Sequence, residues 1–351
     1  MGKGQSAIEY LMTYGWMLLV VAIAGGAVFS FVQQQGIQSS SGFSGDNFQV
    51  ADFGMTTTGL GFILDNLGPE EVTITQINIS QENSTAVIPF NKEVEVGEST
   101  GMKLPHFIDS GATNTVNVNI KHNIGKLFNI TLQGELKGGF EIDESIVGYW
   151  TLRPGQVMDD KMYDISQNSA HGDLVNVNFE QDDKFGEVMS FDGSSKISLT
   201  GDRGSTQTDD ITVMAWAKTN KSNWFMGEGA LFRIKANAGE DAEFWIREQG
   251  FGSSNTIRGG EIQQDKWHHY TGVYNSETGN QKLYVDGELV ATEKPDFESI
   301  GDYHKNLCVG ESYCGSGSYF EGKATEVIIF NRALDQAQVK SFSESPGFEL
   351  E

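Results

Sequence analysis

The sequence predicts a mainly β protein with one long N-terminal α-helix, and two observations support that fold class. Residues 11–32 form an apolar run without a charged side chain. At about 1.5 Å per residue, this run would cross the hydrocarbon core of a bilayer as a helix. After residue 43, short stretches alternate apolar and polar side chains, as in 116–120, and this alternation is typical of half-buried strands. We therefore expect one apolar helix followed by β-rich domains.

Two charged residues precede the apolar run and give it a specific interpretation. Lys3 stands before a glycine, Glu9 follows five residues after that glycine, and the next charge is at Asp46. The stretch KGQSAIEYLMTYGW closely resembles the class III signal of archaeal type IV pilins. The resemblance implies cleavage between Gly4 and Gln5, and pairing of Glu9 with the amino terminus of a neighbouring subunit. A buried carboxylate needs such a partner.

The same resemblance implies where the protein acts and with what. Residues 1–4 would be the leader, 5–35 the hydrophobic assembly helix and 36–42 a Gly/Ser-rich neck. Other copies of the chain, a prepilin peptidase and the assembly machinery would be the partners. The chain would enter the cytoplasmic membrane and then an extracellular filament. A plain membrane anchor and a secretory signal cut within residues 22–27 remain the alternatives.

Composition excludes one class of partner and indicates an exported protein. The net charge of −24 argues against nucleic-acid binding, and it suits either a halophilic source or extensive calcium loading. In an exported protein, Cys308 and Cys314 are expected to form one disulfide. Four Asn-x-Ser/Thr sequons are candidate glycosylation sites: Asn78, Asn83, Asn129 and Asn220.

Residues 43–144 are predicted to form a β-sandwich of six or seven strands. Turn residues at Gly68, Gly97, Pro105 and Gly111 divide the alternating stretches. The apolar phase changes between 72–74 and 77–79, which predicts a bulge or break near Gln76. Such a domain is the globular head expected of an archaeal pilin, and we expect a packing role for it.

Residues 145–345 carry a second resemblance, and 346–351 remain as a tail. The stretches IVGYWTL at 146–152, ITVMAWAK at 211–218, KWHHYTGVY at 266–274 and EVIIFNRAL at 326–334 follow in the order found in laminin G-like, concanavalin A-like modules. Asp286-Gly287 between two alternating stretches is typical of a type I′ hairpin. The resemblance implies a two-sheet antiparallel jelly roll.

Two kinds of site follow from this second resemblance. Many members hold a structural calcium ion, and position in the family assigns it here to Asp164, Asn168 and Glu326. Thr325 stands where the family often has Asp, and the alternative is a turn-capping Asp164 with a surface Glu326. Aromatic residues in predicted loops are candidates for stacking on sugar rings, although each can equally pack a sandwich edge: Trp224, Phe251, Tyr313 and Tyr319.

Catalysis is not expected from the sequence. In 141–144, Glu141 and Asp143 can share a strand face, but Glu144 points the other way, so paired hydrolase carboxylates are not supplied. His268 and His269 fall on opposite faces of a strand. The favoured function is a subunit of a type IV pilus-like filament whose distal domain adheres to glycans or surface proteins. The alternatives are a membrane-anchored display protein that does not polymerise and, less favoured, an extracellular glycoside hydrolase.

Overall fold

The computed structural model describes residues 39–344, apart from 44–47, 57–58, 82–83, 105–106, 126, 167, 169, 200–209, 230, 249, 251 and 301–306. Within that part, the chain is nearly all β, and the only α-helix is α2 (Gln336–Glu344) near the C-terminal end. The predicted fold class is therefore corrected: the helix of the described chain is this short one and not a long N-terminal one. The range 5–35 assigned to the predicted helix lies outside the described residues, as do Gly4, Gln5 and Glu9. No described helix is long and apolar enough to cross a membrane.

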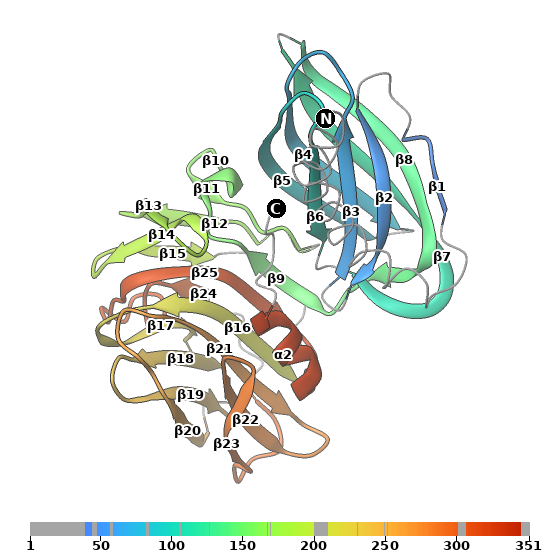
Figure 1. Cartoon of the computed structure of the whole chain (residues 1–351). Coiled ribbons are helices and arrows are strands. Elements are labelled where there is room, and N and C mark those ends of the chain that lie inside the picture. The colour runs from blue at the N-terminus through green and yellow to red at the C-terminus, as the bar shows by residue number, and fades with distance from the viewer. Residues whose placement is uncertain are drawn as a thin grey trace, which may run out of the picture.

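The first eight strands form two sheets (Figure 1). The five-stranded sheet has the order β1-β8-β7-β4-β5, and the three-stranded sheet has the order β2-β3-β6. Their bounds are β1 Ser39–Ser41, β2 Phe48–Thr56, β3 Gly59–Asn66, β4 Val72–Gln81, β5 Ser84–Val94, β6 Ser99–Leu104, β7 Phe107–Ile124 and β8 Leu127–Ile142.

The predicted irregularity near Gln76 is confirmed, and it explains the change of apolar phase. The register of β4 shifts between Ile74 and Gln76 in its pairing with both β5 and β7. Because of this shift, Ile74 and Ile77 are both fully buried although they are three positions apart, an odd spacing that would place them on opposite faces of a regular strand.

The remaining strands form a second sandwich of two sheets. The nine-stranded sheet has the order β10 (Val157–Met158), β11 (Lys161–Met162), β12 (Gly172–Val175), β15 (Lys196–Leu199), β24 (Leu307–Val309), β17 (Ser222–Glu228), β18 (Phe232–Asn237), β19 (Asp241–Arg247), β20 (Ser254–Glu261). The eight-stranded sheet has the order β13 (Asn178–Asp182), β14 (Gly186–Asp192), β25 (Glu321–Phe330), β16 (Ile211–Lys218), β21 (Trp267–Asn275), β22 (Asn280–Val285), β23 (Glu288–Glu293), with β9 (Ile146–Trp150) also on β25.

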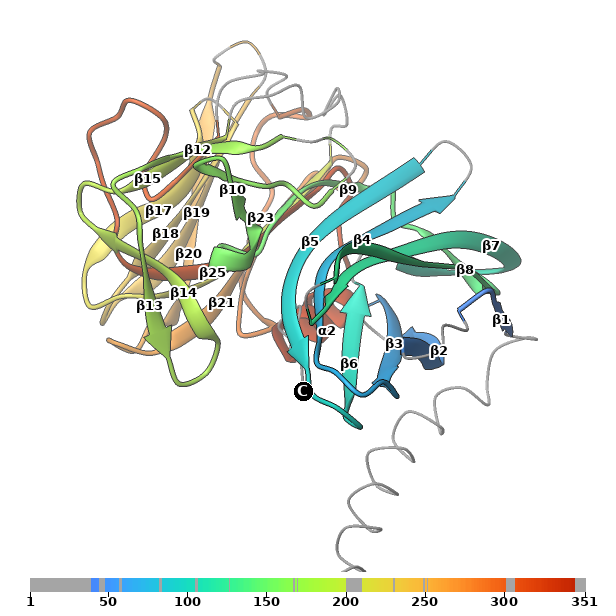
Figure 2. The ribbon, with the colours of Figure 1, turned by 90° about the horizontal axis from the view of Figure 1, so that it is seen from above.

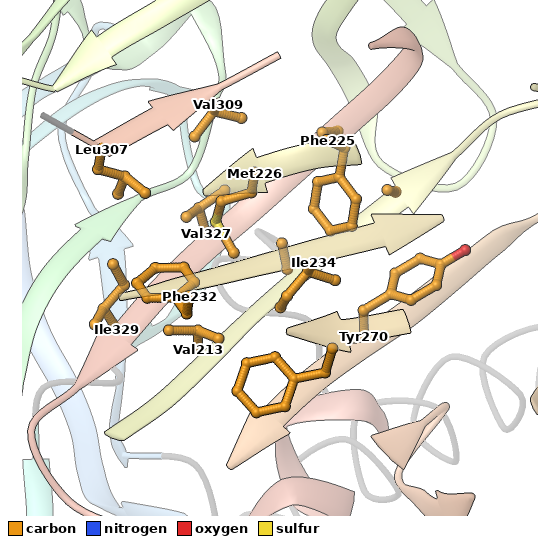
Figure 3. Packing of buried hydrophobic residues seen from close by; sticks show 14 of the residues in the cluster. Val213, Phe225, Met226, Phe232, Ile234, Tyr270, Leu307, Val309, Val327 and Ile329 are labelled. Atoms are coloured by element: carbon orange, nitrogen blue, oxygen red, sulfur yellow. The ribbon is translucent and has the colours of Figure 1, made fainter. Parts of the chain in front are cut away.

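The two sheets bury a common core between their inner faces (Figure 3). Phe225, Phe232 and Ile234 contribute from the nine-stranded sheet, and Val213 and Tyr270 contribute from the eight-stranded sheet. Each burial of a large apolar side chain stabilises the fold by roughly 1.5–3 kcal/mol. The Asp286-Gly287 hairpin is confirmed, since Val285 pairs with Glu288 and both turn residues have positive φ, 51° and 80°.

The outer face of the eight-stranded sheet is covered. Met214, Tyr284 and Phe330 are buried there together with Leu334 and Val339, which lie before and within α2, and this cluster continues into the core of the first sandwich. In Figure 2, α2 lies between the two sandwiches. The outer face of this sheet is therefore occupied by the chain itself.

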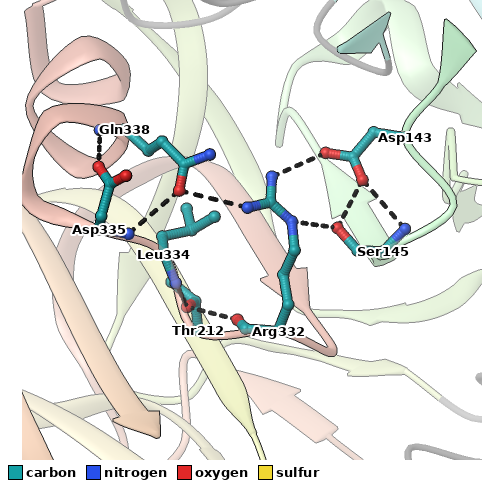
Figure 4. A network of polar contacts seen from close by, with 7 residues as sticks. All are labelled: Asp143, Ser145, Thr212, Arg332, Leu334, Asp335 and Gln338. Carbon is teal, nitrogen blue, oxygen red and sulfur yellow. Dashed lines mark hydrogen bonds and ion pairs between the residues drawn. The ribbon is translucent and has the colours of Figure 1, made fainter. Parts of the chain in front are cut away.

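A polar network fixes the segment that leads into α2 (Figure 4). Arg332 donates from Nη2 to the buried Asp143 at 3.1 Å and from Nε to Ser145 Oγ at 2.7 Å. Asp335 caps α2 by accepting from Gln338 N at 2.9 Å. The network joins the junction between β8 and β9 to the last strand and helix.

Candidate functional site

The outer face of the nine-stranded sheet presents two rows of aromatic and charged side chains. The first row runs from Gly227 through Arg233 and Trp245 to Thr256, and the second runs from Trp224 through Lys235 and Glu243 to Arg258. The residues between them in sequence, such as Ile234 and Phe244, point into the core because side chains alternate along a strand. We call the two rows the β17–β20 face.

Arg233 lies against two aromatic rings at the centre of the first row. Its Cζ lies 4.4 Å from the ring centroid of Trp245 and 4.6 Å from that of Tyr313. Nη2 donates to Gly229 O at 3.3 Å, while Nε is enclosed without a hydrogen-bond partner among the described residues. Burial and, to a smaller extent, Arg247 lower the pKa of Arg233, whereas Tyr313 raises it. The guanidinium is thus half-buried and lies close to two aromatic rings, at distances that favour cation–π attraction.

The second row is an ion-pair ladder beside an indole. Glu243 Oε1 lies 3.3 Å from Lys235 Nζ and 3.5 Å from Arg258 Nε, and Asn237 Nδ2 donates to the same oxygen at 3.1 Å. Trp224 is half-buried at the β17 end of the row, and Lys235 Nζ lies 5.8 Å from its ring.

A disulfide loop, residues 308–319, lies over the edge of this face and holds Tyr313 against Arg233. The predicted disulfide between Cys308 and Cys314 is present and closes the loop. Glu311 organises the interior: it accepts from Gly315 N at 3.0 Å and Gly317 N at 2.7 Å, and it pairs with Lys196 at 2.9 Å. These contacts lower the pKa of Glu311 although its burial opposes them.

Gly227 lets the loop approach the sheet. A Cβ at this position would stand 2.0 Å from Ser312 O and 3.1 Å from Phe232 O, both of which are backbone atoms. Any larger residue would therefore push the loop, and Tyr313 with it, away from the first row.

An open depression of about 370 Å³ adjoins the second row. It is lined by Asn237, Glu240, Asp241, Glu243 and Arg258. Amide and carboxylate oxygens there are acceptors for hydroxyl groups, and the guanidinium and amide nitrogens are donors. The face thus combines stacking surfaces with a polar hollow.

The structure brings three of the four predicted aromatic residues to this region. Trp224 lies in the second row, Tyr313 stacks on Arg233, and Tyr319 lies at the end of the disulfide loop, 5.8 Å from Lys196 Nζ. Phe251 lies outside the described residues. Sequence reasoning missed Arg233 and Trp245, although each stands between two core residues of a strand, a pattern that marks an outward-facing position.

The structure gives each of the three residues predicted to hold calcium other partners. Asp164 accepts from the backbone nitrogens of Tyr149, Ser166 and Ala170 at 2.8–2.9 Å. Asn168 donates to a backbone carbonyl, Val147 O, at 3.0 Å.

Glu326 is engaged on both of its oxygens. It accepts from the hydroxyl of Tyr149 and pairs with Arg153 at 3.2 Å. A guanidinium thus lies against the carboxylate that was assigned to the ion, and no cluster of at least three His, Cys, Asp or Glu groups arranged for a metal occurs among the described residues. This arrangement does not fit a calcium cage, and calcium binding stays a prediction.

Burial shifts the pKa of two groups around Glu326. It raises the pKa of the Asp164 carboxyl, against the hydrogen bonds that lower it. Burial and the neighbouring Glu326 raise the pKa of Tyr149 well above its ordinary value. Both shifts reflect a closed, desolvated pocket around Tyr149.

The structure also places most of the sequons and the residues that were considered for catalysis. Asn220 is exposed, Asn78 is half-buried between the buried Ile77 and Ile79, Asn83 lies outside the described residues, and the side chain of Asn129 is not described. His268 donates from Nδ1 to Asp286 Oδ2 at 2.7 Å. His269 is buried, and that burial lowers its pKa to about 3. Glu141 is half-buried and Glu144 exposed, while Asp143 is committed to Arg332.

Residues 191–340 match the family model of the concanavalin A-like lectin/glucanases superfamily, Laminin_G_3. Over those residues, the second sandwich is similar to the laminin G-like, concanavalin A-like domains of that superfamily.

The individual proteins to which this chain is similar share less than 30% of their residues with it over the matched regions. Pentraxin-related protein PTX3 of Mus musculus is 29% identical over 90 residues, which span 23% of this chain and 23% of that protein. The binding domain of Paraclostridial Mosquitocidal Protein 1 has 15% identity and a TM-score of 0.47, over 58% of this chain and 52% of that chain. Domain 4 of AbnA, a GH43 extracellular arabinanase from Geobacillus stearothermophilus in complex with arabinotriose, has 17% identity and a TM-score of 0.44. The match covers 57% of this chain and 98% of that chain.

Proposed function

We propose that the laminin G-like domain is a non-catalytic module that binds glycans on its β17–β20 face. The observation that carries the proposal is the contrast between the two outer faces. The outer face of the eight-stranded sheet is buried under α2 and the first sandwich, whereas the opposite face presents half-buried Trp224, Trp245 and Tyr313 beside a polar hollow. Aromatic rings offer their faces to sugar rings, and the surrounding polar groups supply hydrogen bonds to hydroxyls.

Binding is favoured over hydrolysis because the two buried carboxylates of this region are already paired. Glu243 bonds with Lys235, Arg258 and Asn237, and Glu311 bonds with Lys196 and the disulfide loop. A general acid needs a raised pKa and a nucleophile needs free access to the sugar. Paired carboxylates instead hold side chains in place.

The test is equilibrium binding of the full chain to a panel of neutral and acidic oligosaccharides. We expect Trp245→Ala to weaken binding about tenfold or more, because it removes a stacking surface and the support of Arg233. Trp267→Ala is the matched control, since this half-buried indole lies on the eight-stranded sheet. A panel in which no glycan binds would overturn the proposal, and so would an equal loss from both variants. Release of reducing sugar that one carboxylate substitution abolishes would favour the hydrolase alternative.

We further propose, from the stretch KGQSAIEYLMTYGW, that the domain is displayed on an extracellular type IV pilus-like filament. Many copies along a filament would convert weak binding at single sites into avidity. Mass spectrometry of the N-terminal peptide, taken from sheared filaments and from membranes, tests this display. A chain that begins at Gln5 and is enriched in filaments is expected. A chain confined to membranes would instead support the anchored display protein.

A further inference from the structure

The β17–β20 face and its border gather cations on a strongly acidic protein. The chain carries a net charge of −24, with 24 Lys and Arg against 48 Asp and Glu. Five of those cations lie on or beside this face, on strands β15, β18, β19 and β20: Lys196, Arg233, Lys235, Arg247 and Arg258. Glu240, Asp241, Glu243 and Glu311 lie in the same region, so it lacks the twofold excess of acidic residues found in the whole chain and is a more favourable place for a negatively charged ligand.

Internal pairing neutralises three of these cations. Glu243 pairs with Lys235 at 3.3 Å and with Arg258 at 3.5 Å, and Glu311 pairs with Lys196 at 2.9 Å. Arg233 has no carboxylate partner among the described residues, and Arg247 is close enough to lower its pKa. The central guanidinium of the face is therefore an uncompensated positive charge.

The surroundings of Arg233 determine what can satisfy it. Trp245 and Tyr313 both lie against the guanidinium, and its N–H donors lie in its plane, so a ligand would accept hydrogen bonds at its edge. A half-buried charge without a counterion is costly, and the planar fork of Arg suits the paired oxygens of a carboxylate or a sulfate.

The hollow next to the second row favours a saccharide over other polyanions. Asn237, Glu240 and Asp241 line it, and Glu243 belongs to both the hollow and the ladder. Acceptors of this kind bind hydroxyl groups, whereas they repel a strand with a phosphate at every residue, as in nucleic acids.

We propose that the ligand of this face is an acidic glycan, with a carboxylated or sulfated sugar at Arg233 and a neutral sugar in the hollow beside Glu243. The inference rests on the proposed glycan-binding function and specifies its ligand class. It requires no change in the fold and no bound metal.

The experiment compares matched acidic and neutral ligands on the purified full chain. Hyaluronan oligosaccharides, which alternate a uronic acid with a neutral sugar, are titrated against their carboxyl-reduced derivatives. Dextran sulfate is titrated against dextran. Single-stranded DNA serves as a polyanion that lacks pyranose rings. We expect at least tenfold tighter binding of one acidic ligand than of its neutral counterpart, and weakening of that binding between about 50 and 500 mM NaCl. The pair that shows the difference tells carboxylate from sulfate.

Two variants assign the effect to Arg233. Arg233→Gln is expected to lower affinity for the acidic ligand about tenfold, the loss of one charge-assisted contact, and to change affinity for the neutral one less than twofold. Lys340→Gln removes an exposed cation from α2 on the opposite sheet and is expected to change neither. The salt titration of the unmodified chain gives an answer even if Arg233→Gln does not fold.

The outcomes separate the two levels of the proposal. Equal binding of acidic and neutral glycans would overturn the acidic-glycan inference and leave glycan binding standing. Binding of DNA as tightly as the acidic glycan would also overturn it, because the face would then respond to charge alone. No binding to any glycan would overturn both.

Discussion

Gly227→Ala tests whether the disulfide loop shapes the β17–β20 face. The new Cβ would stand 2.0 Å from Ser312 O, about 1.4 Å short of ordinary contact, and 2.9 Å from Arg233 Cγ. Backbone atoms cannot yield by rotating a side chain, so the loop must move off the sheet and carry Tyr313 away from Arg233. Overpacking of this kind costs about 1–3 kcal/mol. A cost near 2 kcal/mol lowers the melting temperature of a domain of this size by about 4–8 °C.

The assay combines thermal unfolding with glycan titration on the same preparation. We expect a lower melting temperature together with weaker binding of the glycan, since the aromatic contacts of Arg233 are disrupted. Gly101→Ala is the matched control because a Cβ there meets nothing within 4 Å. Unchanged stability and unchanged affinity for Gly227→Ala would refute the argument that the loop and the sheet are in this contact.

Three further predictions concern the scaffold. Arg332→Met should destabilise the protein by about 3 kcal/mol in urea unfolding, because it leaves the buried Asp143 carboxylate, 5% exposed, without its counterion. A loss of stability below about 0.5 kcal/mol would argue against this role of Arg332. His269, whose pKa burial lowers to about 3, is neutral in the folded state but protonates near pH 6.5 when unfolded. Its contribution to stability is therefore lost as pH falls from about 6.5 toward 3, at up to about 1.4 kcal/mol per pH unit, and the curve for His269→Phe should be flatter in that window. Because Glu326 pairs with Arg153, we expect EDTA and CaCl₂ to leave the melting temperature within about 1 °C, whereas a rise of several degrees with CaCl₂ would favour the calcium prediction.

Local patterns predicted much of the β structure because strands and turns obey short-range rules. The phase change around Gln76 and the Asp286-Gly287 turn are both readable from a few neighbouring residues, and both are present. The disulfide followed from there being only two cysteines. The prediction of one long N-terminal helix in the fold class was wrong, because the α-helix of the described residues is α2.

The binding face could be predicted only in part, because exposure depends on what packs against a sheet from far along the chain. β16 is buried along nearly its whole length, since one face meets the core and the other meets α2 and its surroundings. Alternation assigns Arg233 and Trp245 to the outside of a strand, but it does not tell which sheet keeps an open outer face. Likewise, position in the family assigned Glu326 and Asp164 to one calcium site. It gave no indication that Arg153 pairs with Glu326.

A crystal structure of the chain with a bound acidic oligosaccharide tests the central claim most directly. We predict that the sugar lies on the β17–β20 face, with its carboxylate or sulfate at the edge of Arg233 and a sugar ring near Trp245 or Trp224. A ligand bound instead at the Asp164–Glu326 region, or on the eight-stranded sheet, would contradict the account.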